Sequence, residues 1–163
     1  MKILTEPNKI LHQKCAKVKT FDQDLENLAQ NMVETLFENH GVGLSAPQVG
    51  RLEKIIVVEF NRKRFVDEMD EDEEISEKKS IVIPLTILIN PKVIFSSKTK
   101  EIHEEGCLSL PKIEKSVERP SDVRVLAQDL KGNRVKIRAK GLFCRVLQHE
   151  IDHLSGILIT DKK

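Results

Sequence analysis

Hydrophobic residues recur at helical spacing in two segments, one near each end of the chain. From Phe21 to His40 the apolar positions fall three and four residues apart, and acids and amides occupy the opposite face. Asp22 is a suitable N-cap for this helix, and Gly41 ends the pattern. Helical spacing returns from Leu142 to Leu154, and Gly156 follows as a C-cap. The pattern therefore predicts one helix near each end of the chain.

The middle of the chain has the pattern of strands. Five stretches are rich in β-branched residues or alternate between apolar and polar positions: 54–60, 81–89, 92–96, 122–128 and 134–140. We expect a turn at Asn90-Pro91 and a hairpin around Lys131-Gly132-Asn133. Strands in the middle and helices near the ends favour a single domain of the α+β class.

Two segments fit neither regular pattern. Residues 41–50 are too rich in glycine and proline for a helix, and they predict a shaped loop or an irregular strand. Residues 61–80 contain a dense acidic run, 67–74. Because like charges repel one another and bury nothing, this run predicts a solvated loop.

Composition narrows the class of protein. The chain has 163 residues and a formal charge of +1, which argues against a nucleic-acid binder driven by bulk charge. Its three cysteines are odd in number and widely spaced, so reduced thiols are expected and a disulfide scaffold is not. No apolar run approaches the length of a membrane span, and the first residues contain no signal-like apolar core. We expect a cytoplasmic protein with no membrane or specific nucleic-acid partner.

The strongest chemical signal is the segment His149-Glu150-Ile151-Asp152-His153. Residues four apart on a helix share a face, with Cβ atoms about 5–6 Å apart, so both imidazoles can reach one metal ion. Glu150 projects beside the pair, where a carboxylate could move a proton without binding the metal. Two exposed helix histidines with a chance glutamate would give the same pattern.

A third metal ligand must come from upstream of this helix. The position six residues after His153, where one class of metalloprotease has a histidine, is Ile159. A glutamate from a later helix is also unavailable, because Asp161 is the only acid after His153. The upstream candidates are Cys15, Cys107, Cys144, His12, His40 and His103.

Cys107 is the favoured candidate, because it lies between predicted strands and Gly106 allows close approach of the backbone to a ligand. Cys144 projects about 140° away from His149 around the helix, which fits a buried apolar role. His40 ends a helix, where a positive charge complements the dipole. His103 shares a strand face with Cys107 and stays a weaker competitor.

One thiolate and two imidazoles leave the fourth position of a tetrahedral ion open, as in catalytic rather than structural sites. An ion held there can lower the pKa of its bound water to about 7 and polarise a carbonyl. The thiolate favours a softer ion, Fe(II) or Zn(II), over Mg(II) or Ca(II).

Three segments in order resemble the motifs of peptide deformylases. They are residues 41–48 (Gly-Val-Gly-Leu-Ser-Ala-Pro-Gln), residues 105–109 (Glu-Gly-Cys-Leu-Ser) and residues 148–153 (Gln-His-Glu-Ile-Asp-His). The resemblance extends from Ile3 to Ile159. It implies a catalytic domain over the whole chain, with antiparallel or mixed strands packed around the C-terminal metal-binding helix. It also implies removal of the formyl group from N-formyl-methionine on new polypeptides, with a possible transient contact with the ribosome.

The resemblance assigns roles to individual residues. Cys107, His149 and His153 would hold Fe(II), with Zn(II), Ni(II) or Co(II) able to substitute. Glu150 would be the general acid and base. The Gln48 side chain and the Leu108 backbone N–H would bind the developing oxyanion. A turn glutamine bonded to nearby backbone is the alternative for Gln48.

The substrate would bind beside these groups. The backbone of Val42 and Gly43 would pair with the extended peptide, and three side chains would line the methionine pocket: Leu44, Leu142 and Val146. Core packing is the competing explanation for these three. Asp152 could fix a histidine tautomer or be a plain polar helix residue. Glu105 paired with Arg119 would support Cys107.

The chain departs from the family pattern at Glu114, where many bacterial members have arginine, and in the long acidic run. It also ends at Lys163, without the C-terminal helix of many members, so any ribosome contact through that helix is in doubt. A metalloprotease with the same metal chemistry and a non-catalytic metal-binding relative remain the alternative functions.

Overall fold

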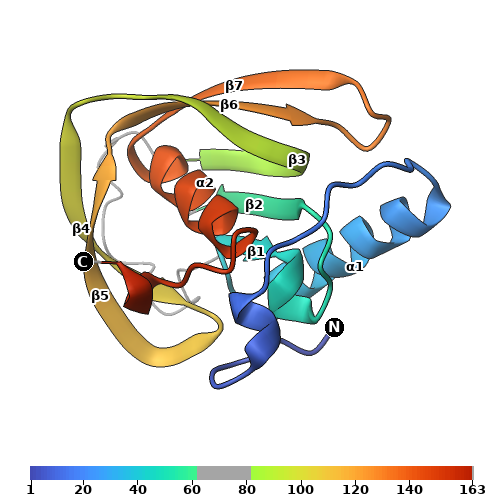
Figure 1. The fold of residues 1–163 in the computed structure, drawn as a ribbon, viewed down its shortest axis with the longest axis horizontal. Coiled ribbons are helices and arrows are strands. Elements are labelled where there is room, and N and C mark those ends of the chain that lie inside the picture. Colours follow the sequence, from blue (N-terminus) through green and yellow to red (C-terminus); the bar gives the residue numbers. More distant parts are fainter. Residues whose placement is uncertain (62–81, 163) are drawn as a thin grey trace, which may run out of the picture.

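In the part of the chain that the structure describes, the strands form two sheets, and α2 contacts both of them (Figure 1). The computed structural model describes residues 1–61 and 82–162. The larger sheet has five antiparallel strands in the order β1-β2-β3-β6-β7. Its strands are β1 (Gly43–Ser45), β2 (Ile55–Asn61), β3 (Val82–Ser96), β6 (Asp122–Gln128) and β7 (Arg134–Lys140). The predicted acidic loop, including residues 67–74, lies outside the described residues.

The second sheet is a hairpin of β4 (Lys100–Cys107) and β5 (Leu110–Pro120), which pair only with each other among the described strands. It arches beside α2, on the side of the molecule away from α1 (Figure 1). The described residues also include three short 3-10 helices: η1 (Lys9–His12), η2 (Ala46–Val49) and η4 (Ile159–Asp161).

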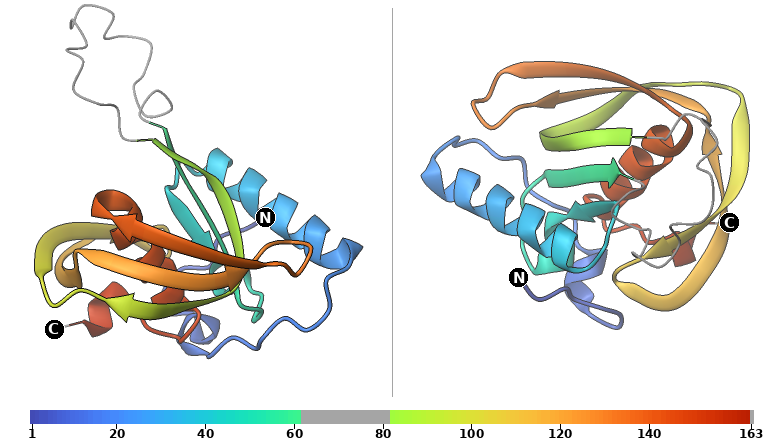
Figure 2. Two further views of the ribbon diagram at one scale, coloured as in Figure 1. Left: turned by 90° about the horizontal axis from the view of Figure 1, so that it is seen from above. Right: turned by 180° about the vertical axis from the view of Figure 1, so that it is seen from behind.

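The two helices pack on opposite faces of the five-stranded sheet. Seen from behind, α1 (Gln23–Glu38) crosses the sheet in front of α2 (Gly141–His153) (Figure 2). Ile56 and Val58 of β2 pack in the cluster that includes α2, whereas Ile55 and Val57 pack in the cluster that includes α1. Because side chains alternate along a strand, a strand covered on both faces is apolar at every position, which explains the continuous run in β2.

The predicted helices are present, with small differences at their ends. The Asp22 carboxylate accepts a hydrogen bond from the Leu25 backbone N–H at 3.1 Å, as expected of an N-cap. The C-terminal helix has Leu154 as its C-cap instead of Gly156. Gly156 lies two residues further on, where its φ of 71° suits a residue without a Cβ.

The turn predicted at Asn90-Pro91 is wrong. β3 continues through both residues as one strand, and Asn90 takes a positive φ of 53° at an irregularity in the pairing with β6. The Asn90 side chain bonds to Val18 of the N-terminal segment and to Gln128 of β6. The dipeptide lies at an irregularity within one long strand, because β3 pairs with β2 up to Ile89 and with β6 again from Lys92 onward.

The structure confirms an α+β fold whose C-terminal helix is surrounded by strands. Among the described residues, no helix is long and apolar enough to cross a membrane.

Candidate metal centre

Two histidines of α2 and one cysteine of β4 meet at the side of α2 that faces the hairpin. The Nε2 atoms of His149 and His153 lie 3.1 Å apart, one helical turn from each other. The Cys107 Sγ lies 3.3 Å from the His153 Nε2, although the residues are far apart in sequence. The three potential ligand atoms all lie within 4.8 Å of one another, and His153 is buried. The sequence-predicted ligand set is therefore brought together.

This donor set fits a divalent transition metal. A thiolate and two imidazole nitrogens match the ligands of catalytic zinc and iron sites. The two ring nitrogens and the sulfur crowd together in a buried site, where a cation would satisfy all three. Among the described residues, these three side chains are the group of histidine, cysteine or acidic residues whose ligand atoms lie close enough together to hold one ion.

Without a metal ion, the pKa of one imidazole lies above the ordinary value for histidine and the pKa of the other lies below it. Burial lowers the pKa of His149, but hydrogen bonds to Cys107 and Glu105 outweigh it and raise this pKa to about 10. Burial and the neighbouring His149 lower the pKa of His153. Because a metal ligand must be deprotonated, binding of an ion would displace a proton from His149.

Glu105 orients His149 from the other side of its ring. The His149 Nδ1 lies 3.0 Å from the Glu105 Oε2, which directs the Nε2 toward Cys107 and His153. Glu105 also accepts bonds from the Arg119 Nε at 2.6 Å and Nη2 at 2.8 Å. Burial raises the pKa of Glu105, but hydrogen bonds from Arg119 and His149 lower it more. The pKa of this carboxyl group therefore lies well below its usual range, and the carboxylate is ionised.

The predicted pairing of Glu105 with Arg119 is present. Two roles were open for Asp152, and among the described residues its printed partners include no histidine. The Asp152 carboxylate accepts a bond from the Arg119 Nη1 at 2.7 Å and pairs with Lys162. Asp152 therefore supports the centre through Arg119, because Glu105 already occupies the acceptor position behind His149.

Glu150 lies beside the ligands with its carboxylate buried. The residue is 3% exposed, and its Oε2 has no hydrogen-bond partner in the described structure. Burial raises the pKa of Glu150 to about 7, although His149 and Ser45 act in the opposite direction. A Cβ atom at Gly43 would lie 2.4 Å from the Glu150 Oε1, so only glycine leaves room for this carboxylate. A bound cation would lower this pKa.

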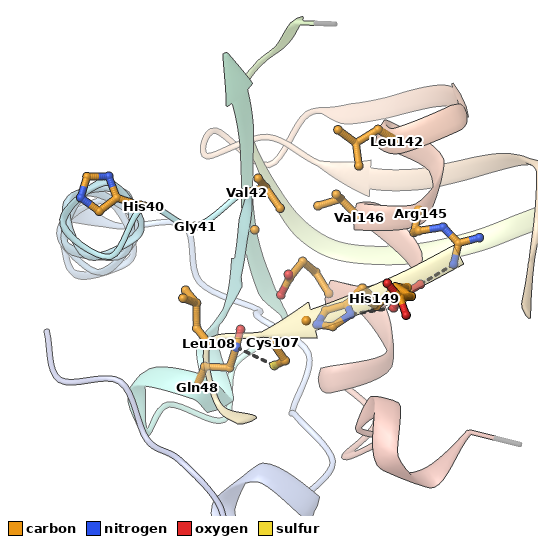
Figure 3. Close-up of a pocket in the computed structure, with 15 residues that line it drawn as sticks. His40, Gly41, Val42, Gln48, Cys107, Leu108, Leu142, Arg145, Val146 and His149 are labelled. Atoms are coloured by element: carbon orange, nitrogen blue, oxygen red, sulfur yellow. Dashed lines mark hydrogen bonds and ion pairs between the residues drawn. The ribbon is translucent and has the colours of Figure 1, made fainter. Parts of the chain in front are cut away.

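The Gln48 side chain bridges the first motif and the cysteine strand. Its Oε1 accepts bonds from the Ser45 N–H and Oγ–H, both at 2.8 Å. Its Nε2 donates to the Ser109 Oγ at 3.3 Å and lies 3.6 Å from the Cys107 Sγ (Figure 3). The amide oxygen thus bonds to nearby backbone, as a turn glutamine does, while the amide nitrogen is aimed at the centre.

A cleft of about 420 Å³ opens onto the metal centre. Leu142, Val146 and His149 line it from α2, and Gln48, Cys107 and Leu108 line it from the opposite side (Figure 3). The remaining lining residues come from the segments around these: His40, Gly41, Val42, Gly43, Glu104, Glu105, Gly106, Arg145 and Glu150.

Leu44 does not line the cleft, contrary to the expectation for the methionine pocket. Its side chain is fully buried in the cluster that packs against α1. In strand β1 neighbouring side chains point to opposite faces, and since position 43 faces Glu150, Leu44 faces the other way.

The other candidate ligands lie elsewhere. Cys144 is buried, with its Sγ 3.3 Å from the Pro120 carbonyl oxygen, and Cys15 belongs to the same hydrophobic cluster. His12 contacts Glu6, and His103 is exposed beside Glu101. His40 lines the outer part of the cleft, beyond the end of α1 at Glu38.

Two residues near the centre were missed by the sequence reasoning. Ser45 anchors Gln48 through its backbone and hydroxyl groups. Arg145 binds Glu105 and lines the cleft. Arg145 lies one turn before His149 on the same helix face, and this spacing could have predicted that its side chain lies near the centre.

Comparison with known proteins agrees with this geometry. The family model described as polypeptide deformylase matches residues 1–163. The peptide deformylase of Dictyoglomus thermophilum is 43% identical over 153 residues, covering 94% of this chain and 86% of the relative. The chloroplastic peptide deformylase 1B of Oryza sativa is 39% identical over 162 residues, covering 99% of this chain, and the chain spans about half, 54%, of that longer protein.

Solved structures give the same result. Peptide deformylase of Ehrlichia chaffeensis superposes with a TM-score of 0.85 at 34% identity, covering 99% of this chain and 87% of the other. That of Plasmodium falciparum superposes with a TM-score of 0.83 at 37% identity, covering 99% and 85%. The chain therefore belongs to the polypeptide deformylase family, and it is a hydrolase that removes the N-formyl group from nascent peptides.

Proposed function

We propose that the chain carries out this deformylation with one divalent metal ion held by Cys107, His149 and His153, on peptides that begin with N-formyl-methionine. One observation carries the proposal: the three ligand atoms converge within 4.8 Å at the base of a cleft, next to a buried glutamate. The thiolate favours Fe(II), with Zn(II), Ni(II) or Co(II) able to replace it. When bound, the ion supplies Lewis acidity that polarises the formyl carbonyl and activates a water molecule.

Glu150 is the proton carrier of the reaction. Its carboxylate accepts the proton of the attacking water and then donates it to the nitrogen of the departing amine. Burial raises the pKa of Glu150 to about 7 in the metal-free chain, and a bound ion would lower it. The carboxyl group would then be ionised near neutral pH and able to accept the proton of the water. The Glu150 Oε2, which has no hydrogen-bond partner among residues 1–61 and 82–162, leaves one oxygen available for the water.

Gln48 and Leu108 stabilise the negative charge that develops on the formyl oxygen. The Gln48 Nε2 faces the Cys107 Sγ, and Ser45 fixes its orientation by binding the Oε1. The backbone N–H of Leu108, the residue after Cys107, is the second donor. Preorganised donors of this kind lower the barrier because they need no reorientation as the charge forms.

The methionine side chain lies against Leu142 and Val146. Both line the cleft from α2: Val146 lies about one turn before His149 and Leu142 about two turns before it. Val42 lines the cleft with them. The backbone of Val42 and Gly43 pairs with the extended peptide, which suits the first segment of an edge strand. The three cysteines are free, which agrees with a reducing compartment, and we place the reaction in the cytoplasm beside newly made chains.

The test is a deformylation assay on anaerobically purified protein, with metal analysis of the same sample. We expect one divalent ion per chain, turnover of a formyl-Met tripeptide, and no cleavage of casein. Acetyl-Met tripeptide is the matched control, since a methyl group replaces the formyl hydrogen and the rest of the peptide is the same. Efficient cleavage of casein would favour a protease, and metal binding without turnover of any formyl peptide would favour a non-catalytic relative.

A further inference from the structure

The proposed metal ligands come from two parts of the fold that different contacts hold together. His149 and His153 belong to α2, which packs on the five-stranded sheet. Cys107 ends β4, and β4 pairs only with β5 among the described strands. The hairpin ladder therefore does not itself fix the distance between the sulfur and the imidazoles. Contacts outside the ladder must do so. Gln48 binds Ser109 and lies against Cys107 from one side, and side chains that link the hairpin to α2 act from the other.

Arg145 is such a link, and it contacts both strands of the hairpin. It projects from α2 one turn before His149. Its Nη1 donates to the Glu105 Oε1 of β4 at 2.6 Å and to the Val117 carbonyl of β5 at 2.9 Å. Its Nη2 donates to the Glu101 carbonyl of β4 at 2.8 Å. One guanidinium thus ties a helix to two strands at three points, and the side chain is only 12% exposed.

Arg145 differs in this from the other arginine at the centre. Arg119 lies on β5 and binds Glu105 of β4, so its bidentate pair lies within the hairpin. Arg119 crosses to α2 at a single point, Asp152. Gln148 of α2 also crosses once, to the Pro120 carbonyl. Arg145 makes the crossing at the cleft, where Glu104, Glu105 and Gly106 of β4 form one wall.

We propose that Arg145 is a positioning residue, which holds β4 against α2 and so keeps Cys107 in place opposite the paired imidazoles. The proposal rests on the metal site proposed above. Arg145 reaches the metal ligands through two routes: along the β4 backbone to Cys107, and through the shared Glu105 carboxylate to His149. Loss of Arg145 leaves Glu105 bound to Arg119, but it releases both backbone carbonyls from α2.

The experiment compares Arg145→Met with Arg138→Met in the full chain. Methionine keeps an unbranched apolar stem and removes the guanidinium. Arg138 is the matched control, because it pairs with Asp122 within the five-stranded sheet and does not touch the hairpin. The first readout is the rate at which zinc-loaded protein releases its ion to a chelator. The second is amide hydrogen exchange of the metal-free protein, segment by segment.

We expect Arg145→Met to release zinc about tenfold faster than the unchanged chain, since supporting side chains contribute about 10- to 100-fold to metal affinity. Exchange should increase in β4 and β5 and stay unchanged in β2, β3 and β6. Arg138→Met should match the unchanged chain in both readouts. Unchanged zinc release together with unchanged exchange in β4 and β5 would overturn the proposal. So would faster exchange spread evenly over the whole chain, which indicates general destabilisation.

Arg145→Lys covers the case in which the methionine variant does not fold. Lysine keeps the charge but offers one ammonium in place of a planar fork, so it cannot hold three acceptors in the same geometry. We expect intermediate zinc release, and a rate equal to that of the unchanged chain would contradict the proposal. If the unchanged chain binds no zinc, the proposed metal site is refuted. Amide hydrogen exchange in β4 and β5 then decides by itself whether Arg145 holds the hairpin against α2.

Discussion

The Cys107 Sγ and the His153 Nε2 lie 3.3 Å apart, with a separation of 46 positions between their residues along the chain. The first ends a strand of a two-stranded hairpin, and the second ends a helix that packs on a different sheet. The proposed reaction depends on this proximity, because the sulfur would be the third ligand of the metal ion. The fourth position of a tetrahedral ion would then stay open for substrate or water.

Glu150→Ala should retain the metal while kcat falls by about 10²–10⁴, the contribution typical of a positioned general acid or base. The ligand atoms of Cys107, His149 and His153 are untouched by the change. Metal content and kcat are measured on the same preparation. Glu34→Ala is the control, since Glu34 is exposed on α1. Normal turnover by the Glu150 variant would refute the proposed proton transfer.

Gln48→Ala should reduce kcat by about 10²–10³, the effect of about 2.7–4 kcal/mol from one lost oxyanion donor. The KM should change much less, because the interaction forms in the transition state. Steady-state kinetics with a formyl-Met peptide measure both constants. Ser109→Ala is the control, since Ser109 contacts the same amide but is not proposed as a donor. An equal loss in both variants would assign Gln48 a structural role.

Gly43→Ala should displace Glu150 and lower both activity and stability. The new Cβ would lie 2.4 Å from the Glu150 Oε1 and 2.9 Å from its Cδ. Overpacking of this kind costs about 1–3 kcal/mol of unfolding free energy. Thermal melting and kcat test the prediction. Gly106→Ala is the control for melting, since a Cβ there meets nothing within 4 Å. An unchanged melting temperature for the Gly43 variant would mean that the carboxylate moves freely.

The stability of the metal-free protein should fall in acid because of Glu105. Its pKa in the folded state lies well below the unfolded value of about 4.3. A carboxyl group with a lowered folded pKa stabilises the fold fully above the unfolded pKa, and this contribution is lost as the pH falls below it. Urea unfolding measured from neutral pH down into this range should therefore give a decreasing free energy of unfolding.

Glu105→Gln should flatten that acid dependence, because the variant has no carboxyl group to titrate. Glu118→Gln is the matched control, since Glu118 forms an exposed pair with Lys100 on the same hairpin. Exposed pairs contribute little, so its acid dependence should equal that of the unchanged chain. If the Glu105 and Glu118 variants behave alike, the network around Glu105 does not account for acid sensitivity.

Much of the fold was predictable because its signals are local. The apolar spacing and the Asp22 cap predicted α1, and the alternation around Gly132 predicted the β6–β7 hairpin. The prediction of a turn at Asn90-Pro91 was wrong, because β3 pairs with β2 before the dipeptide and with β6 after it, and this pairing keeps the strand continuous. Leu44 misled too, because strand β1 turns its side chain toward α1.

The sequence by itself determined that His149 and His153 share a helix face, since the geometry of one helix places residues four apart together. Tertiary structure alone decided that the hairpin brings Cys107 to that face, that Gly43 makes room for Glu150, and that Arg145 spans both hairpin strands. The physical reason is range: helix spacing follows from backbone hydrogen bonds between near neighbours, whereas docking of the hairpin depends on packing and ion pairs between residues distant in the chain.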